Sequence, residues 1–173
     1  SKSPYYRARL TTLFKDVNIP SSVVVTQGWK VEGDDNGAID LFWDLKGDLA
    51  PGGLAHALLI LLTSDWYRGF RSGELYSLLF RGDYFNPDTS LNRVHQMVTR
   101  LRKSIEEQLP GVELHTENSI YFLEIKSDEL RLKIPRNLPE PDPVILRIFA
   151  FRQKFTESIF SSEDVQQVFG LSK

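Results

Sequence analysis

The apolar positions at the start of the chain predict a short helix followed by a small sheet. Within residues 1–17 the apolar side chains recur at helical spacing, which predicts one amphipathic helix. Residues 39–46 alternate between the two faces of a half-buried strand, and the Asp-Asp-Asn-Gly sequence at 34–37 is typical of a turn. Residues 23–46 therefore predict a small antiparallel sheet whose strands are close in sequence.

Three helices are predicted in the middle of the chain, at 54–62, from Ser72 onward and at 89–109. The first is apolar nearly all round, so we expect it to be buried on more than one side. The third follows the Asp-Thr-Ser sequence at 88–90, whose side-chain oxygens can cap it. Its apolar residues repeat at three- and four-residue intervals and define one buried face: Leu91, Val94, Val98, Leu101 and Ile105.

A hairpin is predicted after these helices, with strands at 112–116 and 120–125 and an acidic, polar tip at 117–119. An extended run at 130–134 is expected to continue the sheet of this hairpin. Four prolines at 135–143 are typical of a stiff linker with no apolar face to bury. The linker predicts a domain boundary.

The expected division is therefore a domain at 1–134, the linker at 135–143 and a helical segment at 144–173. The sequence from Ser161 to Lys173 looks like the first helix and turn of a second helix-turn-helix, with Gly170 at the turn and Ser172 able to cap a following helix. Two interpretations remain. The chain is cut within a longer regulator, or Gly170 only ends a helix.

Composition excludes several function classes. A net charge of -2, from 21 basic and 23 acidic residues, argues against a wholly basic nucleic-acid binder. The chain has no cysteine, which excludes disulfide frameworks and thiolate zinc sites. Its longest apolar run is too short to cross a membrane, and no secretion signal is present, so we expect a cytoplasmic protein.

No pattern of catalytic residues is present in the sequence. Nucleotide-binding and zinc-protease motifs are missing, and His56, His95 and His115 fall on different predicted elements. The acidic pairs at 34–35 and 106–107 are explained by a turn and a helix end. We therefore expect no enzyme activity, no cofactor and no metal.

The order of small sheet, three helices and hairpin is that of a winged helix-turn-helix, an α+β fold whose third helix can enter the major groove of DNA. Residues 66–104 carry seven basic and three acidic residues, and the stretch from Ser90 to Ser104 has four basic residues and no acid. Residues 105–134 carry three basic and seven acidic residues. This asymmetry favours phosphate binding by the third helix, although most charged helix faces are simply solvated.

Three segments carry a resemblance to a known family: Ser-Gly-Glu-Leu from Ser72, Val94–Glu106 with Arg-Leu-Arg-Lys at its centre, and Leu114–Tyr121. Together they resemble the OmpR/PhoB type of winged-helix transcription-factor domain, over about residues 23–125. In that family the turn of the wing usually carries a basic residue, whereas Glu117 is acidic. The acidic tip weakens the expected minor-groove contact.

By matching position, the resemblance implies that one face of the third helix binds double-stranded DNA: Asn92, Arg93, Gln96, Thr99, Arg100 and Lys103. Asn118 at the tip of the wing is a further candidate. Arginine and glutamine side chains can read base edges, and a lysine suits phosphate. Arg102 lies at the edge of the apolar face and ranks lower, and His95 is expected to be a packed structural residue.

The loop at 81–87 matches the segment that in relatives contacts RNA polymerase. Tyr84 and Phe85 are therefore candidate partner-binding residues, and the alternative, which we favour, is that both rings only cover the core.

The leading hypothesis is a DNA-binding transcriptional regulator. Its alternative is a winged-helix protein-interaction module without DNA affinity, which the acidic tip and the low pI favour. A monomer and a dimer are both compatible with the pattern.

Overall fold

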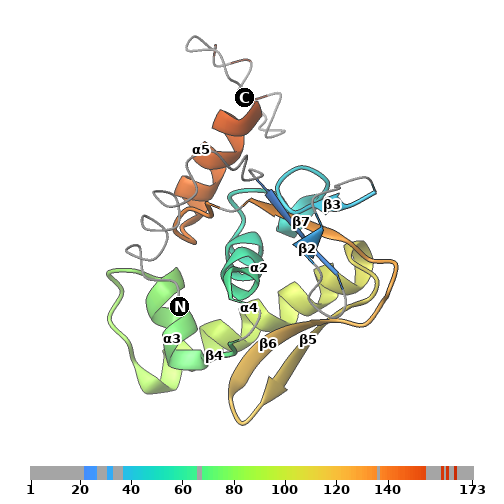
Figure 1. Ribbon diagram of the computed structural model, residues 1–173. Coiled ribbons are helices and arrows are strands. Elements are labelled where there is room, and N and C mark those ends of the chain that lie inside the picture. Colours follow the sequence, from blue (N-terminus) through green and yellow to red (C-terminus); the bar gives the residue numbers. More distant parts are fainter. Residues whose placement is uncertain are drawn as a thin grey trace, which may run out of the picture.

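The computed structural model describes residues 22–26, 31–32, 37–65, 68–135 and 137–154, together with the single positions 161, 163 and 166. These residues form an α+β fold of helices and two small sheets (Figure 1). The elements follow in the order β1 (Ser22–Val25), β2 (Val31–Glu32), β3 (Ile39–Asp40), the 3-10 helix η2 (Gly47–Leu49), α2 (Leu54–Ser64), β4 (Phe70–Arg71), α3 (Ser72–Leu79), α4 (Pro87–Gln108), β5 (Val112–Glu117), β6 (Ile120–Ile125), β7 (Leu132–Pro135) and α5 (Pro143–Lys154).

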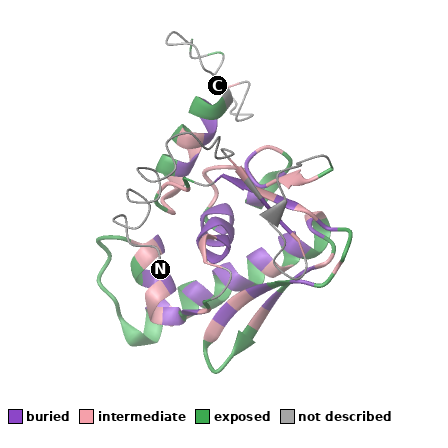
Figure 2. Ribbon diagram, in the orientation of Figure 1, coloured by how far each residue is buried: buried purple, intermediate pink, exposed green. Residues whose placement is uncertain are grey.

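Helix α2 lies at the centre of the fold and contacts α3, α4 and α5 (Figure 1). Every residue from Ala55 to Thr63 is buried, as its apolar sequence predicts (Figure 2). The predicted apolar face of α4 is also inside, with Val94, Leu101 and Ile105 at most 1% exposed. Buried residues of α2, α3 and α4 therefore belong to one hydrophobic core.

Helix α4 begins two residues earlier than predicted, and its cap is Asn86 rather than the sequence at 88–90. The Asn86 side-chain oxygen accepts a hydrogen bond from the Asp88 backbone N–H at 2.9 Å. The Ser90 hydroxyl oxygen accepts one from the Asn86 N–H at 2.9 Å. Pro87 occupies the first turn, where its missing N–H is not needed. Asn86 and Ser90 together fix the start of the helix.

The strand predicted at 39–46 ends at Asp40. Residues 41–44 form a turn, in which the Asp40 carboxylate accepts from the Phe42 N–H at 2.9 Å and the Asp44 carboxylate accepts from the Asp40 N–H at 2.7 Å. Leu41 and Phe42 are both fully buried, although a strand would place them on opposite faces. The turn buries both side chains, which an extended strand could not do.

The first sheet has the strand order β2-β1-β7-β3, and β3 pairs with β7 in parallel while the other pairs are antiparallel. The expected antiparallel sheet from sequence neighbours is thus wrong in part. β7 lies in this sheet, between β1 and β3, and not in the sheet of the hairpin. Leu132 lies opposite both Val25 and Ile39, so β7 pairs with β1 on one side and with β3 on the other.

The second sheet has the order β4-β6-β5 and contains the predicted hairpin. Its turn is shorter than expected, because Glu117 still pairs with Ile120. Asn118 and Ser119 have φ angles of 50° and 62°, which is the left-handed pair that a two-residue hairpin turn requires. The tip is therefore formed by Asn118 and Ser119 alone.

Helix α5 packs against α2 (Figure 1). Leu146 and Ala150 are fully buried in the common core, and the Phe149 ring lies 5.2 Å from the Phe42 ring. Leu138, within the proline-rich segment, also packs on that core. The expected helix at 1–17 and nearly all of the expected second helix-turn-helix lie outside the described residues, so the division at 135–143 stays a prediction.

Candidate nucleic-acid interface

The exposed face of α4 contains all six residues predicted to bind DNA on this helix. At 100° per residue, Asn92, Gln96, Thr99 and Lys103 lie at its centre, and Arg93 and Arg100 lie on the shoulder that faces α2 and α3. The rotation of α4 about its axis therefore agrees with the one predicted from the sequence. All six side chains are exposed: Asn92, Arg93, Gln96, Thr99, Arg100 and Lys103.

Three of these side chains are available to a ligand. Among the residues that the structure describes, no hydrogen bond or ion pair involves the side chains of Gln96, Arg100 or Lys103. Asn92 donates to the Asp88 carbonyl at 3.1 Å, and the Thr99 hydroxyl donates to the His95 carbonyl at 2.9 Å. These two therefore bind their own helix, although the Thr99 oxygen can still accept.

The Arg93 side chain, in contrast, already has partners within the protein. Its guanidinium lies 2.9 Å from the Asp83 carboxylate, donates to the Tyr76 hydroxyl at 3.2 Å and sits 4.0 Å from the centre of the Phe80 ring. The hydrogen bond to Asp83 raises the pKa of Arg93 further above its usual value. We call these four residues the Arg93 cluster.

Arg102 faces the opposite flank of α4. Its Nε donates to the Leu114 carbonyl at 3.2 Å, and its guanidinium donates to the Thr116 hydroxyl at 2.6 Å. It therefore connects α4 to the hairpin strand β5, in agreement with its lower rank as a DNA contact. His95 is exposed, so its expected packed role is wrong.

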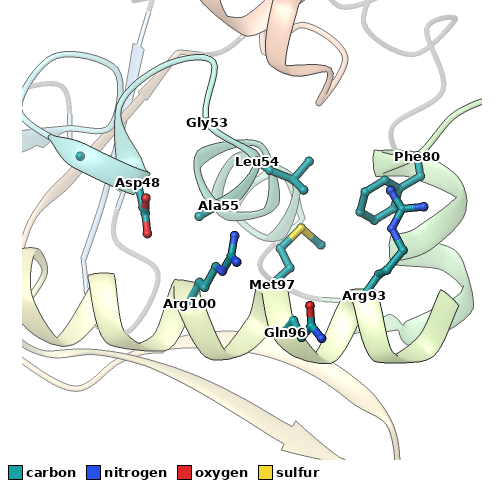
Figure 3. A pocket seen from close by; sticks show the side chains of 10 residues that line it. Asp48, Gly53, Leu54, Ala55, Phe80, Arg93, Gln96, Met97 and Arg100 are labelled. Carbon is teal, nitrogen blue, oxygen red and sulfur yellow. The ribbon is translucent and has the colours of Figure 1, made fainter. Parts of the chain in front are cut away.

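A hollow of about 270 Å³ opens beside the exposed face, between α4, η2 and the first residues of α2 (Figure 3). Arg93, Gln96 and Arg100 line one side, and Leu54 lines another. In Figure 3 the Arg100 side chain extends toward α2, and Asp48 lies at the rim. The face is thus an α-helix with a shallow recess along one side.

The outer face of the hairpin is acidic. His115 Nε2 lies 3.2 Å from the Glu113 carboxylate and 3.0 Å from the Glu124 carboxylate. Lys126 pairs with Glu124 at 2.7 Å, and this hydrogen bond lowers the pKa of Glu124. Glu117 is exposed beside the tip. Approach of this face to phosphates is electrostatically unfavourable.

The loop between α3 and α4 (residues 80–86, the α3–α4 loop) exposes two aromatic side chains, Tyr84 and, to a smaller extent, Phe85. Tyr84 is 89% exposed, so the favoured expectation that both rings cover the core is wrong for this residue. The Phe85 ring packs edge-on against Tyr76, with ring centres 5.4 Å apart. Phe85 therefore covers Tyr76 on one side while it stays 36% exposed.

Sequence reasoning missed the partners of the two arginines. Asp83 and Tyr76 carry the Arg93 cluster, and the Leu114 carbonyl and Thr116 bind Arg102. The spacing of Asp83 and Arg93, ten residues apart across a loop, has no local pattern that could reveal it.

Within the described ranges no group of histidine, cysteine or acidic residues could hold a metal ion, and no helix there is long and apolar enough to cross a membrane. No family model, curated protein or solved structure matches this chain.

Proposed function

We propose that this protein is a sequence-specific DNA-binding transcriptional regulator of the cytoplasm, with α4 as its recognition helix. In this proposal α2, α3 and α4 with the β5–β6 hairpin form a winged helix-turn-helix similar to the OmpR/PhoB type, and the hairpin is the wing. The partner is double-stranded DNA, which α4 enters through the major groove.

One observation carries the proposal. Gln96, Arg100 and Lys103 project from two turns of α4 without a partner in the described part of the chain. No acidic residue interrupts the helix from Ser90 to Ser104. A helix of 22 residues, about 33 Å long, reaches across a major groove with this face. An amide one turn before two cations suits a base edge with phosphates close by.

A second candidate function has a specific observation in its favour. The acidic outer face of the hairpin, with Glu113, Glu117 and Glu124, fits a protein-interaction module better than a DNA-binding wing. The exposed Tyr84 would then mark a protein-binding loop, and in the DNA-binding proposal the same loop is the candidate contact for RNA polymerase.

The experiment titrates the protein against duplexes selected from a random pool and against unselected duplexes, at several salt concentrations. Lys103→Ala should weaken binding to both kinds of duplex and flatten the salt dependence by about one unit of slope, because about one fewer counterion is released. Gln96→Ala should leave the slope unchanged and cost about 1–3 kcal/mol of discrimination at one base position.

The matched control is Arg152→Ala, which removes an exposed cation from α5. It should leave affinity, slope and discrimination unchanged. A parent protein with no affinity above background at low salt would refute the DNA-binding proposal and leave the interaction module.

A further inference from the structure

The Arg93 cluster joins three consecutive parts of the fold. Tyr76 belongs to α3, Asp83 to the α3–α4 loop and Arg93 to α4, and Phe80 lies where α3 ends. One guanidinium binds a carboxylate at 2.9 Å, a hydroxyl at 3.2 Å and a ring face at 4.0 Å. All three contacts point away from the centre of the exposed face of α4.

Tyr76 extends these contacts along the loop. It is 3% exposed, its hydroxyl donates to the Tyr84 carbonyl at 3.4 Å, and its ring lies 4.9 Å from Phe80 and 5.4 Å from Phe85. The hydroxyl that receives the Arg93 hydrogen bond is therefore the same one that holds the loop backbone. A movement of Arg93 would break its contacts with Asp83 and Phe80 and would remove a hydrogen bond from the hydroxyl that holds the loop backbone.

We propose that Arg93 is a positioning residue that fixes the α3–α4 loop and the setting of α4 against α3, and that it does not itself contact DNA. This rests on the proposed function for its effect on DNA, while its effect on the loop stands by itself. It reassigns a residue that the sequence placed among the DNA contacts.

The chemistry of arginine fits this role better than that of lysine. A planar guanidinium can stack on one ring and donate in its own plane to two oxygens at once, whereas an ammonium is a compact charge that lies at one point. Asp83 also offsets the charge of Arg93 locally. The pair therefore adds little to the attraction of the α4 face for phosphates, and Arg93→Lys would keep the charge without keeping the geometry.

The first test compares Arg93→Ala, Arg93→Lys and Lys103→Ala on a selected duplex over a range of salt. Arg93→Ala should lower the affinity about tenfold, the size expected for a lost contact network, with the same salt slope as the parent. Arg93→Lys should recover little of this loss. If Arg93→Ala flattens the slope by about one unit and Arg93→Lys restores it, Arg93 contacts a phosphate and the proposal is overturned.

Asp83→Ala separates the two roles by the sign of its effect. If Arg93 is a positioning residue, removal of Asp83 should lower the affinity, and the double variant with Arg93→Ala should be no weaker than Arg93→Ala alone. If Arg93 binds DNA, removal of Asp83 frees the guanidinium, so the affinity should rise in Asp83→Ala and this gain should vanish in the double variant. A gain that depends on Arg93 in this way overturns the proposal.

Hydrogen exchange in the free protein tests the loop without DNA. The hydrogen-bonded amides of Asp83 and Asn86 and of the first turn of α4 should exchange faster in Arg93→Ala than in the parent, and Arg100→Ala should leave them unchanged as the matched control. Unchanged exchange in Arg93→Ala overturns the proposal, with unfolding midpoints confirming that each variant is folded. If the parent does not bind DNA, the proposed function fails, and faster exchange in Arg93→Ala still supports the positioning role.

Discussion

The buried histidine of α2 makes the stability of the fold depend on pH. His56 is 0% exposed, its Nε2 lies 3.0 Å from the Leu41 carbonyl and its ring packs edge-on against Phe42 at 5.1 Å. Nδ1 has no hydrogen-bond partner among the described residues. The neutral ring, with Nε2 donating to the carbonyl, fits this site, and a second proton on Nδ1 would place a charge in the core.

Burial lowers the pKa of His56 from 6.5 to about 4. Above pH 6.5 the ring is neutral in the folded and unfolded chains, so it adds no pH dependence. As the pH falls from 6.5 to about 4, the unfolded chain takes up a proton that the folded chain refuses, and stability falls. At 1.36 kcal/mol per pKa unit the loss reaches about 3 kcal/mol near pH 4.

The assay is urea unfolding of the parent and of His56→Gln at pH 7, 6, 5 and 4.5. Glutamine keeps a donor for the Leu41 carbonyl and cannot titrate, so the difference between the two proteins isolates His56 from all other groups. The stability of the parent relative to the variant should stay constant from pH 7 to about 6.5 and should fall from there to pH 4.5. A constant difference, or a ring that titrates near 6.5 by NMR in the folded protein, would refute the reasoning.

Three further changes test the core, the cap of α4 and the hairpin. Leu101→Ala should cost about 2–5 kcal/mol in urea unfolding, because the side chain is fully buried, and a loss under about 0.5 kcal/mol would contradict the orientation of α4. Asn86→Ala should cost about 1 kcal/mol through the lost cap, while Asn92→Ala, also exposed but within the helix, should cost less. Glu117→Lys should tighten binding to every duplex, because it removes a repulsion from phosphates, and unchanged affinity would place the hairpin away from the DNA.

The sequence predicted the helices well because their apolar residues lie in one continuous core. For α4 the spacing alone set the rotation, since Val94, Val98 and Leu101 all face inward as expected. The rotation then determined which polar residues are exposed. This step needed no information from distant parts of the chain.

The first sheet was harder to predict because its pairing depends on residues far apart in sequence. β7 inserts beside β1 and β3 after more than 90 intervening residues of helices and hairpin. The strand prediction was wrong at 41–44 because Leu41 and Phe42 are adjacent and both buried, whereas a half-buried strand would expose one of them. Aspartates at positions 40 and 44 supply the turn's hydrogen bonds, a local signal that the apolar pattern concealed.

The contacts of the basic residues change what the charge of the sequence implies for DNA binding. Of the seven basic residues at 66–104, three pair with acidic residues: Arg68 with Glu74, Arg81 with Glu140 and Arg93 with Asp83. A fourth, Arg102, binds the hairpin. Arg71, Arg100 and Lys103 are left without a partner among the residues described.

Among the seven basic residues at 66–104, these three can bind phosphates and release counterions from DNA without first breaking a contact to another described residue. At about 0.9 unit of slope per neutralised phosphate, binding through these three cations should give a salt slope of about -2.7. Counting all seven cations would instead give about -6. Titration of the parent across salt concentrations distinguishes these values. A slope near -6 would mean that the ion pairs open on binding or that other parts of the chain reach the DNA, and the positioning role of Arg93 would then lose its electrostatic argument.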